Sequence, residues 1–318
     1  MRNEHGKKRQ IERQIGWLAV VALILACVLR PYPIGAQQPQ SPELVSIRVA
    51  GTRIKNVHPA KRPAGPGDWL ESHPEVGQTF EQYIASNPNR PSNRLTTIFI
   101  LPIGKFSASQ QQVVVYAKEL LSLFYELPVE TLEPTPLAAI PPEARRTNPA
   151  IGHEQLLTTH VLQKLLPPRR PINAVAVLGL TTSDLWPGEG WNFVFGQADL
   201  RNRVGIYSLF RYGDPAADAD HFRLCLERTL KVAVHETGHM LGIQHCTAYE
   251  CGMNGSNNLA ELDRNLLGFC TECEQKVWWA CRLDPRNRYK LLVKFAADNK
   301  LSEEEGLWKA SLDKLDSR

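Results

Sequence analysis

The stretch at 235–245 reads His235-Glu236-Thr237-Gly238-His239-Met240-Leu241-Gly242-Ile243-Gln244-His245. Two histidines four residues apart on a helix lie about 40° apart around its axis, so both imidazoles project from one face and can share a metal ion. Glu236 is one position further on, where its carboxylate can reach a metal-bound water without being a ligand. The pattern predicts a helix that ends in a metal site.

The continuation of this stretch supplies a third ligand. Gly242 follows His239 by three residues, and His245 follows Gly242 by three. A glycine can adopt positive φ and turn the chain sharply, so that His245 returns to the metal. Three neutral imidazoles and one open position are typical of catalytic zinc. For the pentapeptide alone the alternative is an ordinary pair of helix histidines, and the continuation argues against it. We therefore expect a zinc metallopeptidase with Glu236 as general base.

The cysteines form a second pattern. Cys246 and Cys251 have the spacing C-x4-C, and Cys270 and Cys273 have the spacing C-x2-C. Four thiolates at these spacings suit a tetrahedral structural zinc, while two disulfides or a redox-active Cys270/Cys273 pair are the alternatives. His245 and Cys246 are adjacent and would face opposite sides of an extended chain. We hypothesise that the second zinc holds His245 in place.

The charge of the chain is concentrated at its N-terminus. With 318 residues and 43% hydrophobic composition, the chain can bury one substantial core. Residues 1–30 hold six Lys or Arg against Glu4 and Glu12, which accounts for the whole net charge of +4. The remainder is near neutral and lacks the basic surface that nucleic-acid binding requires, so we expect no nucleic-acid partner.

The first 36 residues have the pattern of an export signal. A basic stretch precedes an apolar run from Ile15 to Leu29, which at 15 residues is short for a membrane-spanning helix. We predict a signal peptide or membrane anchor over 1–36, and hence a periplasmic, secreted or membrane-anchored protein. Lipid attachment at Cys27 and a buried N-terminal helix of a cytoplasmic protein stay open as alternatives.

Three further regions follow. Residues 37–90 are predicted to be a Pro/Gln-rich linker and wrapping segment with one strand over 44–49, residues 91–300 the metallopeptidase domain, and residues 301–318 a C-terminal helical tail. Within the domain the patterns predict a mixed α/β fold. The expected strands are 95–103, 128–132, 174–180, 191–198 and 204–210, and the expected helices are 107–127, 153–166 and 221–241.

Together these motifs resemble those of the archaemetzincins, a branch of the metzincin metallopeptidases. The resemblance rests on HExxHxxGxxHC, on C-x-M at Cys251 to Met253, and on the later CxxC. It also includes a stretch that these proteins share, which reads Trp191, Asn192, Phe193, Val194, Phe195, Gly196, Gln197 and Ala198. It extends from about Leu95 to Leu292, some two-thirds of the chain. The leader is a departure, since a typical archaemetzincin lacks one.

The resemblance implies a metzincin-like α/β fold with a five-stranded mixed sheet and one antiparallel edge strand, which we place at 191–198. An exposed edge can pair with an extended peptide substrate. The resemblance implies aminopeptidase-like activity on short peptides, Met253 as the Met-turn residue and two zinc ions. One zinc would be catalytic, bound by His235, His239 and His245, and one structural, bound by Cys246, Cys251, Cys270 and Cys273.

Two other functions are alternatives to a peptidase. A non-catalytic protein with structural zinc would contain metal without turnover, and an exported thiol-disulfide protein using Cys270 and Cys273 would contain no metal. The open coordination position and Glu236 argue against the first. Metal analysis together with a peptide cleavage assay separates all three.

Overall fold

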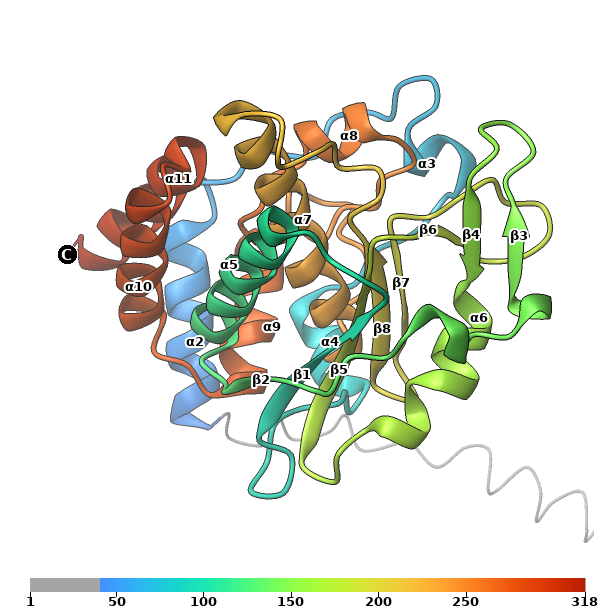
Figure 1. Cartoon of the computed structure of the whole chain (residues 1–318). Helices are drawn as coiled ribbons and strands as arrows, with labels where there is room; N and C mark the ends of the chain where they lie inside the picture. The colour runs from blue at the N-terminus through green and yellow to red at the C-terminus, as the bar shows by residue number, and fades with distance from the viewer. Residues whose placement is uncertain (1–40, 318) are drawn as a thin grey trace, which may run out of the picture. The chain divides into compact units, whose positions relative to one another are not determined.

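A mixed five-stranded sheet organises the computed structural model, which describes residues 41–317 (Figure 1). The strand order is β2-β1-β5-β8-β7, with every neighbouring pair parallel except β7 and β8. This arrangement confirms the predicted mixed sheet and its antiparallel edge strand. The strands are β1 (Thr97–Ile103), β2 (Val129–Thr131), β5 (Ala174–Thr181), β7 (Gly196–Asp199) and β8 (Val204–Ser208).

Side chains alternate between the two faces of this sheet. In β1, Ile98 and Ile100 enter the larger hydrophobic cluster, whereas Phe99 and Leu101 enter the smaller one on the opposite face. Every residue of β5 is buried. A central parallel strand covered on both faces has this continuous apolar sequence, which is why 174–180 was predictable.

Two long helices pack on the face of the larger cluster. They are α5 (Ala108–Tyr125) and α7 (Ala219–Met240), and both confirm the helices predicted over 107–127 and 221–241. Ser107 and Gln110 form a reciprocal capping box at the start of α5. The Asp218 side chain accepts a hydrogen bond from the backbone N–H of His221 at the start of α7. The polar caps explain where these helices begin.

The opposite face is covered by a small second sheet and short helical turns. Its strands, in the order β3-β4-β6, are β3 (Arg145–Thr147), β4 (Glu154–Leu157) and β6 (Asp184–Trp186). The helix predicted over 153–166 is therefore wrong at its beginning. Pairing of Gln155 and Leu156 with strands on both sides outweighs the helical spacing. The helical turns are η1 (Leu137–Ala139), η2 (Pro142–Ala144), α6 (Thr158–His160), the π-helix η3 (Val161–Leu165) and η4 (Pro167–Arg169).

The upstream segment 41–90 forms three helices: α2 (Pro42–Ile54), α3 (Trp69–Ser72) and α4 (Phe80–Ala85). The strand predicted over Leu44–Val49 is wrong, because these residues lie in α2. The buried residues of α2 are Ile47, Gly51 and Ile54, which have helical spacing. Gly51 packs so closely on Gln275 that a Cβ at 51 would lie 2.4 Å from its side-chain carbon. Tertiary packing thus decides the conformation.

The C-terminal part adds four helices: α8 (Leu259–Arg264), α9 (Thr271–Cys281), α10 (Pro285–Asp298) and α11 (Ser302–Asp316). Glu303, Glu304 and Glu305 lie in the first turn of α11, where acidic side chains complement the helix dipole. Between α9 and α10, the fully buried Arg288 donates to Glu274 at 2.7 Å. From Glu43 onward the described chain packs as one unit.

The predicted leader and Cys27 lie outside the described residues. Within residues 41–317, no helix combines the length and the apolar character needed to cross a bilayer.

Candidate metal centres and cleft

Three imidazoles converge at the C-terminal end of α7. His235 and His239 lie on the helix, and Gly242, with a φ of 87°, turns the chain so that His245 joins them. One ligand atom from each ring lies within 4.8 Å of those of the other two. The Nε2 atoms of His235 and His239 are 2.9 Å apart. The sharp turn expected at Gly242 is therefore present, and a Cβ there would lie 2.8 Å from Pro88.

Each of these rings has a polar partner at Nδ1. Nδ1 of His235 lies 2.8 Å from the Gly252 carbonyl, and Nδ1 of His239 lies 2.7 Å from the Ile243 carbonyl. Nδ1 of His245 lies 2.9 Å from the Glu75 carboxylate. Carbonyl and carboxylate oxygens require an N–H, so the proton sits on Nδ1 and the Nε2 lone pairs face one another. Lone pairs arranged in this way can bind one shared cation.

The electrostatics of the rings agree with metal binding. Burial, followed by the neighbouring imidazoles, lowers the pKa of His235 well below its usual value. Burial and His245 lower the pKa of His239 to about 3. Both rings are therefore neutral at physiological pH, the form in which histidine binds a metal.

Glu236 lies beside these rings, buried under the edge strand. Only 5% of its surface is exposed, and its Oε2 has no hydrogen-bond partner among the described residues. Burial raises the pKa of Glu236 to about 8. Its Oε1 packs against Gly196 of β7, where a Cβ would lie only 2.4 Å away. Glycine at 196 is thus required for this close approach.

The edge strand is shorter than the sequence predicted. Of residues 191–198, only Gly196, Gln197 and Ala198 belong to β7, which pairs with β8 and forms the edge of the sheet. The correction concerns 191–195, which precede the strand. Phe195 is buried against Tyr212, and Trp191 is 38% exposed. Four of the residues 191–195 line a cavity (Trp191, Phe193, Val194 and Phe195), and only the Phe195 carbonyl continues the ladder, accepting from the Ser208 N–H at 3.0 Å.

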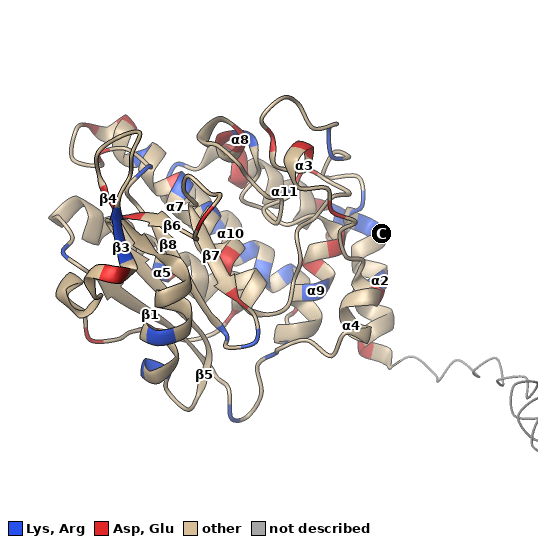
Figure 2. Cartoon of the chain, turned by 90° about the vertical axis from the view of Figure 1, so that its right-hand side faces the viewer, with Lys and Arg blue, Asp and Glu red and all other residues tan. Residues whose placement is uncertain are grey.

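A cavity of about 410 Å³ connects the edge strand to the imidazoles. Its lining includes Gly196 to Ala198 on one side and His235, Glu236, His239 and His245 on the other. Apolar walls come from two distant parts of the chain, with Trp69 from α3 and Trp191 from the segment before β7. Figure 2 turns this side of the molecule toward the viewer, with α3 above the level of β7. A concave apolar site with few polar groups is typical of a ligand site.

Four cysteines form a second, buried cluster. The sulfur atoms of Cys246, Cys251, Cys270 and Cys273 all lie within 4.8 Å of one another, and none is in a disulfide. Sγ of Cys246 and Sγ of Cys270 are 3.6 Å apart. Tetrahedral zinc with Zn–S bonds of about 2.3 Å would separate its sulfurs by about 3.8 Å. The donor set and its size fit a structural zinc ion.

The thiols of this cluster interact strongly. Hydrogen bonds, first from Cys251 and then from Cys270 and Cys273, lower the pKa of Cys246, while burial raises the pKa of Cys251. Backbone N–H groups of Met253 and Cys270 donate to Sγ of Cys251 at 3.5 and 3.2 Å. N–H groups directed at sulfur stabilise a thiolate, the form that binds zinc.

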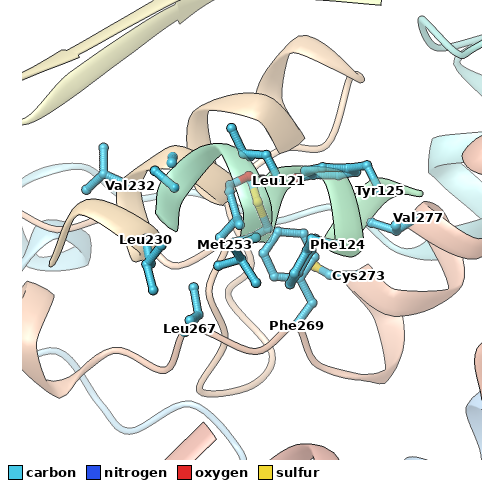
Figure 3. Close-up of a cluster of buried hydrophobic side chains, with 14 of the residues drawn as sticks. Leu121, Phe124, Tyr125, Leu230, Val232, Met253, Leu267, Phe269, Cys273 and Val277 are labelled. Carbon is cyan, nitrogen blue, oxygen red and sulfur yellow. Dashed lines mark hydrogen bonds between the residues drawn. The ribbon is translucent and has the colours of Figure 1, made fainter. Parts of the chain in front are cut away.

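Backbone contacts connect the two clusters. The N–H of Cys246 donates to the Met253 carbonyl at 2.8 Å, and the Asn254 amide donates to the Cys246 carbonyl at 2.7 Å. Met253 is fully buried beneath α7, where a Cβ on Gly238 would lie 2.7 Å from its sulfur. Figure 3 shows Met253 among buried side chains that include Phe124 and Phe269. Met253 therefore lies between the helix of two histidines and the loop of the cysteines.

Two residues of the site, Trp69 and Glu75, were not predicted from the sequence, and both come from the upstream segment. Glu75 contacts His245, and its carboxylate also accepts from Trp69 Nε1 at 3.0 Å. Burial alone would raise the pKa of Glu75, but the contacts with His245 and Trp69 outweigh it and hold this pKa below its usual range. Glu75 and His245 are 170 residues apart, so no spacing pattern could connect them.

Comparison with known proteins shows what this chain is similar to. The sequence profile of peptidase family M54 matches residues 169–278, which include all seven residues of the two clusters. The chain is 35% identical over 265 residues to Archaemetzincin-2 of Homo sapiens, and the match covers 73% of each protein. It is 40% identical over 114 residues to the archaemetzincin of Archaeoglobus fulgidus, covering 36% of this chain and 64% of that protein. The crystal structure of archaemetzincin from Methanopyrus kandleri aligns with a TM-score of 0.48 and 27% identity, over 61% of this chain and 99% of that one.

Proposed function

The chain belongs to the archaemetzincins, peptidase family M54, and is a zinc metallopeptidase; we propose that His235, His239 and His245 hold its catalytic zinc and that Glu236 is the general base. The observation that carries this proposal is the convergence of three imidazoles whose Nδ1 atoms all have acceptors. When bound, zinc supplies Lewis acidity, which polarises the peptide carbonyl and lowers the pKa of water toward about 7.

Glu236 performs the proton transfers in this proposal. Its buried carboxylate takes the proton from the attacking water and returns it to the leaving amine. Burial raises the pKa of Glu236, so its carboxylate holds a proton more strongly than an exposed one, and a bound zinc ion would oppose this shift and favour the ionised form that accepts the proton. The products are two shorter peptides, or a free amino acid and a shortened peptide.

We further propose that the outer edge of β7 binds the peptide substrate. Gly196, Gln197 and Ala198 line the cavity with Glu236, so a strand added to this edge would pass the carboxylate. Main-chain hydrogen bonds would then hold the peptide without reading its sequence. The cavity of about 410 Å³ accommodates a short segment of peptide.

Action on the free N-terminal end of short peptides is the finer part of the proposal. It rests on the family resemblance and on the modest cavity. Glu236 is the only carboxylate among the described residues that line this cavity. If the activity is aminopeptidase-like, acetylation of the substrate N-terminus will abolish cleavage, whereas cleavage of acetylated peptides would make the enzyme an endopeptidase.

The four cysteines are proposed to hold a second, structural zinc. Support comes from the buried sulfur cluster without disulfides. A closed site of four thiolates stabilises the surrounding loops and leaves no position for a substrate. Two zinc ions per chain are expected in the purified protein. A measured content near one zinc ion per chain would show that one of the two proposed sites does not bind zinc.

The decisive experiment joins zinc quantification with cleavage of a peptide library followed by mass spectrometry. Zinc-dependent turnover that a chelator removes and zinc restores supports the proposal. Zinc without turnover on any peptide would favour the non-catalytic alternative.

Export is proposed from the basic and apolar pattern of residues 1–36. N-terminal sequencing of the mature protein tests it. A start close to Gln37 indicates cleavage, whereas an intact N-terminus in the membrane fraction indicates attachment through this segment. An intact protein in the cytoplasmic fraction would contradict export.

A further inference from the structure

Three aromatic rings join the two rims of the cleft. The rings of Trp69 and His73, from the upstream segment, stack with their centroids 4.0 Å apart and an interplanar angle of 16°. Trp191, from the segment before β7, stacks on His73 at 5.1 Å and on Trp69 at 6.2 Å. We call these three side chains the aromatic bridge. It connects parts of the chain more than 100 residues apart, which lie on the same side of the molecule in Figure 1.

Both ends of the aromatic bridge are fixed by hydrogen bonds. The indole N–H of Trp69 donates to Glu75 at 3.0 Å, and its backbone N–H donates to Glu261 at 2.9 Å. The carbonyl of Trp191 accepts from Arg146 at 3.1 Å. The backbone at each rim is therefore held independently of the rings. Across the bridge itself, ring stacking is the contact that joins the rims.

The aromatic bridge lies close to the three imidazoles. Trp69 meets His245 edge-on with 5.2 Å between ring centroids, and both tryptophans line the cavity that contains Glu236. Because the Trp69 ring is in edge contact with His245, the aromatic bridge bounds the cavity directly beside the imidazoles.

We propose that the aromatic bridge limits the length of substrate that the cleft accepts on this side. This inference rests on the proposed peptidase function and assigns a role in substrate selection to Trp69, His73 and Trp191. Short peptides, or the ends of longer ones, fit in the part of the cavity that the rings leave open. A chain that continues in both directions must displace a ring. Because the bridge is held by stacking between the rims, removing one ring opens the cleft without removing a backbone hydrogen bond.

Trp191→Ala is the test, since Trp191 contacts neither His245 nor Glu75 in the described interactions and is 38% exposed. Turnover is measured on a series of peptides that share one scissile bond and increase from two to about ten residues. In the full-length wild type, kcat/KM is expected to fall as the peptides lengthen. Trp191→Ala should raise the ratio of kcat/KM for the longest peptides to kcat/KM for the shortest ones about tenfold.

Two further variants control this comparison. Trp191→Phe keeps a ring at the rim and should restore most of the length dependence. Val76→Ala is the matched control, because Val76 is 99% exposed and belongs to the same upstream segment without lining the cavity. It should behave as the wild type at every length.

A binding measurement separates this inference from the proposed function. The same peptides are titrated by calorimetry into the Glu236→Gln protein with and without Trp191→Ala. Longer peptides should bind about tenfold more tightly when the ring is absent, whether or not the wild type shows turnover. An unchanged length profile in both assays overturns the proposal. So does equal weakening at all lengths, because the ring would then hold substrate rather than block it.

Discussion

Nδ1 of His245 lies 2.9 Å from both carboxylate oxygens of Glu75, which joins the upstream segment to the third imidazole of the metal centre. A carboxylate in this position orients the ring, fixes its tautomer and makes Nε2 a stronger ligand. His245 is also the one imidazole of the three that does not lie on α7. Glu75 is therefore a positioning residue for the ligand with the least support from regular structure.

Glu75→Ala is expected to weaken zinc binding at the catalytic site about 10- to 100-fold, because His245 loses its acceptor. Glu75→Gln should lie between this variant and the wild type, since its amide oxygen still accepts one hydrogen bond. Competition with a zinc chelator of known affinity measures the change. Val76→Ala, at the neighbouring exposed position, should bind zinc normally. Wild-type affinity in folded Glu75→Ala would show that the contact does not support the metal.

Glu236→Gln should retain both zinc ions and lose turnover about 10²- to 10⁴-fold, the usual contribution of a general base. The amide has nearly the same shape as the carboxylate but cannot accept the proton. Metal analysis and steady-state kinetics on the same preparation give the answer. A variant with normal zinc content and normal turnover removes Glu236 from the mechanism.

Gly196→Ala tests the close approach of the edge strand to Glu236, the proposed general base. A Cβ at 196 would lie 2.4 Å from Oε1 of Glu236, so the carboxylate or the strand must move. A shift of the carboxylate by about 1 Å from its reacting position lowers kcat by about 100-fold. Gly306→Ala is the matched control, because a Cβ at 306 meets nothing within 4 Å. If kcat of Gly196→Ala equals that of the control, Glu236 does not depend on this packing.

The parts of the fold that were predictable are those in which local sequence and final environment agree. The run at Ala174–Thr181 is buried at every position, and the capping box of Ser107 marks the start of α5. The clustering of the imidazoles was predictable for the same reason, since His235 and His239 have a fixed spacing on one helix. In each case a short stretch of chain contains the whole signal.

The errors occur where a distant contact decides the local structure. Residues 44–49 alternate like a strand, yet they lie in α2, which packs on the core through Ile47, Gly51 and Ile54. Glu154 to Leu157 have helical spacing, yet they pair with strands on both sides. Glu75 shows the same limit for the site, because its importance depends on His245, 170 residues away. Single-sequence patterns contain no information on such pairings.

The cysteine cluster should also control the catalytic metal, because Cys246 follows His245 directly. The N–H of Cys246 donates to the Met253 carbonyl, and the Asn254 amide donates to the Cys246 carbonyl, so the loop that carries His245 depends on the loop that begins at Cys251. Replacing Cys270 and Cys273 together by Ser removes two of the four proposed thiolate ligands. The remaining two cannot complete a tetrahedral site.

The double variant Cys270→Ser, Cys273→Ser is therefore expected to lose its structural zinc and, with it, most of the affinity of the catalytic site. Zinc content is measured after dialysis at limiting metal, and circular dichroism reports whether the sheet and helices persist. Cys225→Ser is a suitable comparison, since Cys225 is buried in the core apart from the cluster. A folded double variant that keeps one tightly bound zinc and normal turnover would show that His245 is positioned without the cysteines. The contact with Glu75 would then be the main support of the third imidazole.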